Sequence, residues 1–197
     1  EGRATCRVIC HDTRSGVSRT VLTGLVFANG VCLSHDRQSI LVAQTWNGKI
    51  TRYWIDGPRK GQSEELISDL PGYPDNIRRA SDGTYWCALV GMRSPAFDLA
   101  MEIPQMRRRM VNRVAPDNWL FPSTNAGCVI KFDDKGNVLL SLWDKAGKDH
   151  PQVTSLREHK GKLYLAGTNN NRLGILDLPD ADQGWTAWQS YWGENRA

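Results

Sequence analysis

The sequence predicts an all-β fold made of four-stranded antiparallel propeller blades, and three observations support this prediction. A short polar step opens an apolar strand at Asn29 and again at Asp75, 46 residues further along the chain. A turn and a second strand follow each step, so the two segments form an internal repeat. A repeat of about 40 to 50 residues with several short strands is typical of propeller blades. A two-sheet sandwich also uses short strands, but it would not repeat a motif at this spacing.

The first half of the chain contains runs rich in β-branched and aromatic residues, separated by short turns. Residues 1–24 are expected to form the end of one blade, and residues 25–70 the next blade. Asn47-Gly48 lies between two such runs and is the strongest type of short hairpin signal. The strands expected from these runs are 5–11, 17–22, 25–34, 39–45, 49–55 and 64–70.

The second half contains another full blade, expected at 71–143, and a last blade, expected at 151–178. Residues 91–125 interrupt the first of these. Thr154 aligns with Asp75 in a step of 79 residues, and the excess over the first step is close to the length of the interruption. The strands expected are 75–79, 85–90, 127–133, 138–143, 153–157, 162–166 and 172–176.

The interruption contains the segment that reads as helical, residues 98–114. Pro104 predicts either a late start or a kink in this helix. Its basic residues, including Arg107 to Arg109, lie mostly off the apolar face, and we expect the segment to cap one end of the propeller. It could be a surface excursion, a lid, or a basic helix that makes peripheral membrane contact through residues 97–114; the lid is favoured over the membrane. Its apolar positions are Leu99, Ile103, Met106, Met110 and Val114.

Residues 1–178 would form the propeller, and residues 179–197 a tail. The tail has three tryptophans but no strand-like alternation, so it is expected to be docked or disordered. The propeller part amounts to about two and a half blades, and each blade buries its faces against its neighbours. We therefore expect the chain to be the C-terminal portion of a longer protein.

Composition narrows the class of partner. A net charge of +4, with dispersed basic residues, argues against nucleic acid. The five cysteines are scattered and form no C-x-x-C pair, which argues against a zinc site and favours buried free thiols. Composition leaves the oligomeric state open.

Candidate metal ligands follow from the repeat. The first strand of each blade lines the central channel of a propeller, so the alignment brings Asn29, Asp75 and Thr154 together. Asn76 adds a further oxygen donor, and such donors suit a hard cation such as Ca²⁺. Because Ca²⁺ takes six to eight oxygens, these residues would form only part of a site. The alternative is that Asn and Asp begin these strands merely because they cap turns.

The residues also resemble a known family. The segments 27–34, 45–61 and, most specifically, 70–79 (Leu-Pro-Gly-Tyr-Pro-Asp-Asn-Ile-Arg-Arg) look like the strictosidine-synthase-like proteins. The resemblance covers roughly residues 1–178 and implies a six-bladed propeller in a superfamily that includes paraoxonases and gluconolactonase-type lactonases. It also implies a membrane-associated or extracytoplasmic location.

The resemblance implies a function as well. The superfamily holds a channel calcium with an Asn at an Asn-Gly strand start, an Asp in the next blade and, in paraoxonases, a neighbouring Asn. Asn29, Asp75 and Asn76 match this pattern, which implies a calcium-assisted hydrolase of lactones or aryl esters acting on a small-molecule substrate. Asp75 could alternatively serve as the base. A non-catalytic, membrane-associated binding propeller is the rival that is not an enzyme.

Two further positions bear on function. Glu158-His159-Lys160-Gly161 resembles the segment that carries the catalytic acid/base of strictosidine synthase, an enzyme that condenses an amine with an aldehyde in a Pictet–Spengler reaction. The alternative for Glu158 is a structural residue before a hairpin turn. Gln44 stands where the family often has Glu, so a carboxylate is lost near the second strand of its blade.

Overall fold

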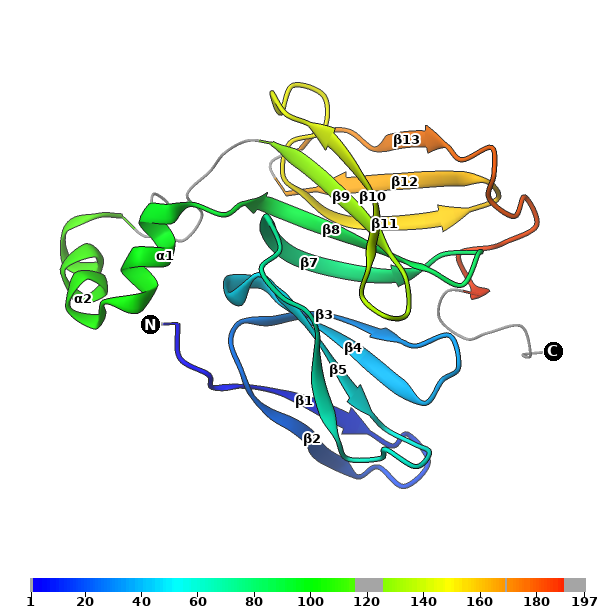
Figure 1. The fold of residues 1–197 in the computed structure, drawn as a ribbon, viewed down its shortest axis with the longest axis horizontal. Helices are drawn as coiled ribbons and strands as arrows, with labels where there is room; N and C mark the ends of the chain where they lie inside the picture. Colours follow the sequence, from blue (N-terminus) through cyan, green and yellow to red (C-terminus); the bar gives the residue numbers. More distant parts are fainter. Residues whose placement is uncertain (1, 116–125, 169, 190–197) are drawn as a thin grey trace.

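The computed structural model describes residues 2–115, 126–168 and 170–189, which fold into antiparallel sheets arranged side by side (Figure 1). Two sheets have four strands, in the orders β3-β4-β5-β6 and β10-β9-β8-β7. A third has the order β11-β12-β13, and β1 pairs with β2 alone. These are propeller blades, as the sequence predicted. The strands of the first half are β1 (Cys6–His11), β2 (Ser18–Leu25), β3 (Ala28–Leu33), β4 (Ser39–Gln44), β5 (Lys49–Trp54) and β6 (Ser63–Ile67).

The second half supplies the other two sheets and two helices. Strands β8 and β9 pair directly although the helical insertion separates them in sequence. The insertion therefore leaves the blade intact. Its helices are α1 (Pro95–Glu102) and α2 (Pro104–Arg113); the strands are β7 (Gly72–Arg79), β8 (Tyr85–Met92), β9 (Gly127–Phe132), β10 (Val138–Asp144), β11 (Val153–His159), β12 (Lys162–Gly167) and β13 (Gly174–Asp177).

The first strands of the three larger sheets lie next to one another. Strand β3 packs beside β7, and β7 packs beside β11. Glycine is needed where β3 meets β7, because a Cβ at Gly30 would overlap the Asp75 carbonyl oxygen and come within 2.7 Å of the Asn76 Cα atom. This close contact sets the position of the two inner strands relative to each other.

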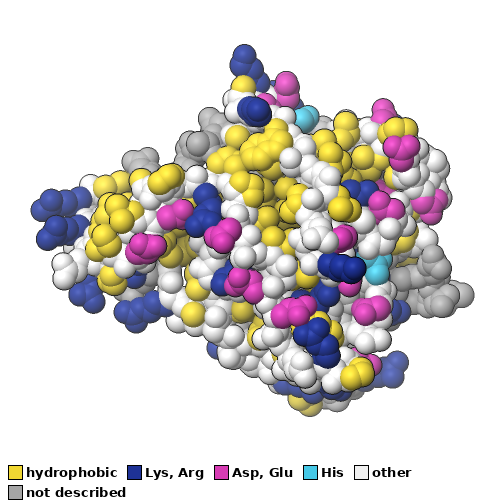
Figure 2. Space-filling view, viewed as in Figure 1, with side chains coloured by type: hydrophobic (Ala, Val, Ile, Leu, Met, Phe, Trp, Pro, Cys, Tyr) yellow, Lys and Arg dark blue, Asp and Glu magenta, His cyan; other side chains and the backbone are white. Residues whose placement is uncertain are grey.

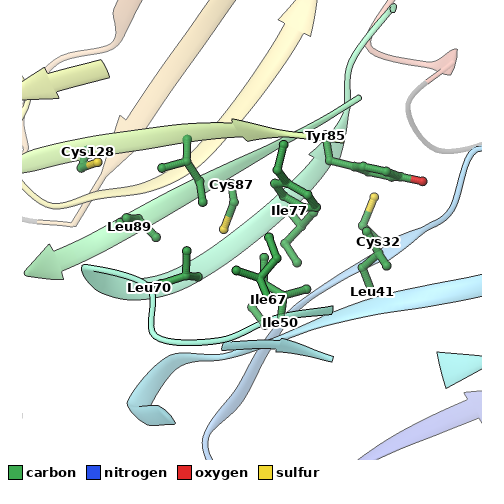
Figure 3. Packing of buried hydrophobic residues seen from close by; sticks show 13 residues of the cluster. Cys32, Leu41, Ile50, Ile67, Leu70, Ile77, Tyr85, Cys87, Leu89 and Cys128 are labelled. Carbon is green, nitrogen blue, oxygen red and sulfur yellow. The ribbon is translucent and has the colours of Figure 1, made fainter. Parts of the chain in front are cut away.

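Two apolar cores lie between the three larger sheets. Side chains such as Leu41, Ile50 and Ile77 fill the space between the β3–β6 and β7–β10 sheets (Figure 3). Trp86 and Leu163 belong to a second cluster between the β7–β10 and β11–β13 sheets. Burial of large apolar side chains on both faces of the β7–β10 sheet packs the three sheets against one another.

Three expectations need correction. The strand expected at 25–34 is interrupted, because Phe27 adopts a positive φ of 47° between β2 and β3. The helical segment expected at 98–114 begins earlier, at Pro95, and is two helices. The break at Ile103 lies where Pro104 predicted a kink, because proline disfavours helical backbone in the residue before it. Of the five cysteines, Cys32, Cys87 and Cys128 are buried, whereas Cys6 is half-buried and Cys10 is exposed.

The described part of the tail is docked. Trp185 is buried, and its carbonyl oxygen accepts a hydrogen bond from the Lys160 amide. The carbonyl of Gln189 accepts a bond of 2.6 Å from the Arg79 guanidinium. Residues 179–189 therefore lie against the ends of β7 and β11; Trp192 falls outside the described residues. No helix in the described ranges is long and apolar enough to cross a membrane.

Candidate metal site

The inner strands bring Asn29, Asp75, Asn76 and Thr154 together, as the repeat alignment predicted. The Asn29 side chain lies close enough to the Asp75 carboxyl to favour its charged form. The Asn76 Nδ2 group donates to Asp75 Oδ1 at 2.8 Å and to the carbonyl oxygen of Thr154 at 2.9 Å. Residues from three sheets thus meet around one carboxylate. Asp75 itself is only 8% exposed.

Each of the three inner strands is irregular where it enters this cluster. The pairing register shifts between Ala28 and Val31 in β3 and between Pro74 and Ile77 in β7. A third shift falls at Thr154 in β11, between its two neighbours. Bulges leave backbone groups unpaired and redirect side chains, and they are over-represented next to active sites. The shared irregularity is what turns these polar groups toward one another.

Thr45 links Asn29 to the strand that carries Asp75. Its hydroxyl donates to the Pro74 carbonyl oxygen at 2.8 Å and accepts a hydrogen bond of 3.3 Å from Asn29 Nδ2. The residue before Asp75 and the Asn29 amide are therefore held by one buried hydroxyl. Sequence reasoning missed Thr45, since a threonine after a strand carries no signal of its own.

The carboxylate of Asp75 is in an unfavourable environment for its charge. Burial raises the pKa of the Asp75 carboxyl to about 6, while the hydrogen bond from Asn29 and the charge of Arg78 act in the opposite direction. No group of three or more His, Cys, Asp and Glu side chains suited to a metal occurs in the described ranges. The cluster is instead one carboxylate surrounded by amides and carbonyls.

This donor set suits part of a calcium site. A carboxylate, two amide oxygens and a backbone carbonyl are the hard oxygen ligands that Ca²⁺ prefers, though fewer than the six it needs. A buried carboxylate with a raised pKa is also a group that a bound cation would stabilise. Both amides would have to rearrange to ligate, because Asn29 and Asn76 each act as a donor toward Asp75 and would have to turn their oxygens inward.

Helix α1 lies at the same end of the inner strands as this cluster. Phe97 on α1 packs edge-on against Trp46 and Tyr73, with ring centroids 5.9 and 5.6 Å apart, and Phe27 stacks on Trp46 at 5.0 Å. Phe27 and Tyr73 each precede a cluster residue by two positions. The helical insertion is thus anchored beside the candidate site, where the predicted lid would have to lie.

Gln44 does not belong to the cluster. Its Oε1 atom accepts a hydrogen bond of 2.8 Å from the Val26 amide, and its Nε2 group donates to Thr51 Oγ1 at 2.8 Å. The buried amide therefore holds the β2–β3 connection against β5. The Glu that the resemblance implies at this position would therefore alter a structural contact.

Glu158 lies at the other end of β11 from Thr154, four residues or roughly 13 Å along the strand. Glu158 is only 1% exposed. The Ser81 amide donates to its Oε1 atom at 3.1 Å, and Trp86 Nε1 donates to its Oε2 atom at 3.0 Å. Both carboxylate oxygens are thus engaged between two sheets. The acid/base role predicted for Glu158 stays a prediction, and this placement lends it no support.

The fold and the convergence of the inner strands define a β-propeller, and solved structures share that fold. The chain superposes on a luciferin-regenerating enzyme with a TM-score of 0.58 and 14% identity, covering 87% of this chain and 51% of that one. It superposes on a gluconolactonase of Xanthomonas campestris with a TM-score of 0.57 and 18% identity, covering 89% and 46%. At these identities the likeness shows the fold alone.

Sequence relatives identify the family. The strictosidine synthase family model matches residues 1–58. The chain is 35% identical to strictosidine synthase-like 10 of Arabidopsis thaliana, covering 88% of this chain and 47% of that protein. It is 33% identical to the adipocyte plasma membrane-associated protein of Salmo salar, covering 90% and 44%. The chain belongs to the strictosidine-synthase-like family, and it spans about half the length of these relatives.

Proposed function

We propose that this strictosidine-synthase-like propeller is a calcium-assisted hydrolase of lactones or aryl esters. The observation that carries the proposal is the meeting of Asn29, Asp75, Asn76 and the Thr154 carbonyl at bulges in three inner strands. Strand-start residues that only capped turns would not need to converge on one buried carboxylate. The cluster has the chemistry of a partial oxygen-ligand site.

In this proposal Asn29, Asp75 and Asn76 would hold the metal. A bound Ca²⁺ polarises a carbonyl and stabilises the negative charge that develops on its oxygen. The protein's own contribution is positional: Thr45 fixes Asn29 relative to the strand that carries Asp75. In the alternative, Asp75 is the general base instead of a metal ligand, because a pKa of about 6 without metal places its carboxylate in the range where it can accept a proton near neutral pH.

The structural neighbours suggest which substrates to test first. One, from Xanthomonas campestris, is described as a gluconolactonase, and another, from Agrobacterium tumefaciens, is described as a calcium-binding regucalcin. Because one fold supports many activities, this is analogy and ranks below the geometry of the site. It places sugar lactones at the head of the substrate panel, ahead of aryl esters.

The test is hydrolysis of a lactone panel and an aryl acetate, with and without a chelator. We expect chelation to abolish turnover, added Ca²⁺ to restore it, and Asp75→Asn to remove it. Lys135→Gln, an exposed change on a turn of the β7–β10 sheet, is the control and should leave the rates unchanged. Turnover that persists in chelator would contradict the metal role. The Asp75→Asn variant would then still test whether Asp75 acts as the base.

The alternative reaction, condensation of an amine with an aldehyde, rests on Glu158. Its carboxylate would have to leave the Ser81 and Trp86 donors to reach a substrate. Glu158→Gln preserves the shape of the side chain, so it separates chemistry from packing. A condensation rate that Glu158→Gln leaves unchanged would exclude this role.

A second candidate function, binding at a membrane surface, has its own observation. On the helical insertion Leu99 is 50% exposed and Val111 is 55% exposed, while Arg108, Arg109 and Arg113 are exposed as well. Figure 2 shows hydrophobic side chains gathered over the helices with Lys and Arg side chains beside them. Exposed apolar groups bordered by basic ones suit the surface of an anionic bilayer.

Arg107 is not part of that surface. Its guanidinium donates to the carbonyl oxygens of Ala100 and Met101 and so caps the end of α1. The variant that tests membrane binding should therefore leave Arg107 in place. Neutralising it would disturb the packing of the two helices rather than the surface charge alone.

The membrane test is sedimentation with phosphatidylcholine vesicles that contain or lack phosphatidylserine. The triple variant R108Q/R109Q/R113Q should lose binding to the anionic vesicles. The matched control R14Q/K135Q/K148Q removes the same charge from exposed positions outside the insertion and should bind like the parent. Equal loss in both variants would indicate a net-charge effect, and equal retention would rule out this surface.

A further inference from the structure

The metal-site cluster consists of Asn29, Asp75, Asn76 and the Thr154 carbonyl. Arg78 is the charged residue that lies nearest to this cluster in sequence without belonging to it. The proposed function gives Arg78 no role. Arg78 follows Asn76 by two positions in β7. Its Nη1 group donates to the Ile77 carbonyl oxygen at 2.8 Å, and its Nη2 group contacts Asn76 Oδ1 at 3.4 Å. Its charge also acts on the Asp75 carboxyl, since it opposes the effect of burial there.

We propose that Arg78 is a built-in counter-cation that weakens Ca²⁺ binding at Asn29, Asp75 and Asn76 by competing with the metal. This inference rests on the proposed function, because it concerns the affinity of the same site. It assigns Arg78 two effects, one through charge and one through the orientation of the Asn76 amide.

The charge effect follows from the donor set. Asp75 is the one carboxylate among the ligands placed by the described residues, so the ligands carry a single negative charge. The guanidinium of Arg78 is permanently protonated and balances that charge. A divalent cation entering the cluster would therefore meet a neutral site with a like charge at its edge, and repulsion is strong where solvent is excluded.

The amide effect follows from the hydrogen bonds of Asn76. Its Oδ1 atom faces Arg78, and its Nδ2 group faces Asp75 and the Thr154 carbonyl. This orientation presents a donor, not a ligand, to the centre of the cluster. Arg78 favours it by contacting the oxygen that would otherwise be free to turn toward a metal. Removing the guanidinium removes that preference.

The two effects can be separated by the choice of substitution. Arg78→Gln and Arg78→Met both remove the charge, and Met also removes every donor while keeping an unbranched stem. Arg78→Lys keeps the charge but loses the planar guanidinium. If the charge dominates, Arg78→Lys should bind Ca²⁺ as weakly as the parent does. If the amide contact dominates, its Ca²⁺ affinity should lie between those of the parent and Arg78→Gln.

The experiment is calorimetric titration of the full chain with Ca²⁺, after a chelator has been dialysed away. We expect Arg78→Gln and Arg78→Met to bind Ca²⁺ roughly ten-fold more tightly than the parent, an order-of-magnitude figure for removing one nearby like charge. Lys49→Gln is the matched control, because it removes one positive charge from an exposed ion pair of β5. Its affinity should match that of the parent.

Each outcome has a distinct meaning. Tighter binding by the neutral variants, or binding by those variants alone, supports the competition. Equal affinity of the parent, Arg78→Gln and Arg78→Met would overturn it while leaving the calcium site standing. Absence of Ca²⁺ binding in every variant would overturn both this inference and the calcium role in the proposed function. Two neutral variants guard against a single one that fails to fold.

Discussion

Two buried carboxylates at opposite ends of the inner strands differ in how their charge is accommodated. Glu158 accepts one hydrogen bond on each oxygen, from the Ser81 amide and the Trp86 ring. Asp75 accepts a hydrogen bond from the Asn76 amide and lies beside the Asn29 amide, and amides can turn either a nitrogen or an oxygen toward their neighbours. Fixed donors from backbone and indole hold the Glu158 carboxylate in one position. In our proposal, adaptable amides let the second carboxylate accept a cation.

The surroundings of Glu158 are closed by the tail, whereas those of Asp75 contain irregular backbone. Near Glu158 the tail covers the strand ends, with the Asp182 amide bonded to Ser81 Oγ at 3.1 Å. Near Asp75 the three inner strands are bulged, and the insertion is attached by aromatic contacts of Phe97. Strained and adaptable polar groups concentrate where a protein binds or reacts, so the comparison separates the closed end from the candidate functional end.

The largest expected effect tests the structural side of this comparison. Glu158→Ala should lower the free energy of unfolding by about 3 kcal/mol or more, because it leaves two buried donors without acceptors. Urea denaturation measures the change. Glu102→Ala, which removes an exposed carboxylate of α1, is the control and should cost less than about 0.5 kcal/mol. A mild loss in Glu158→Ala, close to the control, would contradict a structural role.

The next effect tests the close approach that builds the functional end. Gly30→Ala should destabilise the fold by about 1 to 3 kcal/mol, because its Cβ would overlap the backbone of Asp75 and force β3 away from β7. It should also weaken Ca²⁺ binding. Gly91→Ala is the matched control, since the nearest atom to its Cβ, Tyr73 Cδ2, is 3.7 Å away. Similar melting temperatures for the two variants would show that the strands can separate without cost.

A third prediction concerns pH in the absence of metal. Because the pKa of Asp75 is raised to about 6 in the folded state, the folded protein binds more protons than the unfolded one between the two pKa values. Stability in chelator should therefore fall as pH rises from about 4 to 6, by about 1 to 2 kcal/mol after allowance for solvent screening. Denaturation at several pH values measures this fall. Asp75→Asn should abolish it, and an unchanged profile in that variant would assign the dependence to other groups.

The repeat made much of this arrangement predictable from sequence. Asn29 and Asp75 stand at equivalent strand starts, and strands of equivalent position meet at the centre of a propeller. That step also placed Thr154 beside them, although its backbone carbonyl and not its side chain makes the observed contact. Periodicity sets which residues face inward, but the bulges that decide which atom points where depend on packing between sheets.

The roles of single polar residues could not be derived in this way. Glu158 carried a resemblance to a catalytic segment, yet its surroundings are Ser81 and Trp86, which lie more than 70 residues earlier in the chain. Arg107 looked like part of a basic surface, but the break at Pro104 turns it back onto α1. Such contacts depend on tertiary geometry that a local pattern does not encode.

The smallest expected effect concerns Gln44, which stands where the family resemblance implies a Glu. Gln44→Glu should lower the free energy of unfolding by about 1 kcal/mol, because a charge replaces a neutral amide at a residue that is 5% exposed. Two hydrogen bonds offset most of the cost, since the Val26 amide still has an acceptor and the Thr51 hydroxyl can donate in place of accepting. It should leave Ca²⁺ affinity unchanged, since the side chain holds the β2–β3 connection and not the metal-site cluster. Calorimetric titration of this variant beside Arg78→Gln sharpens the comparison, because one charge change lies outside the site and the other at its edge. A marked gain in affinity from Gln44→Glu would place this carboxylate among the ligands and enlarge the functional end.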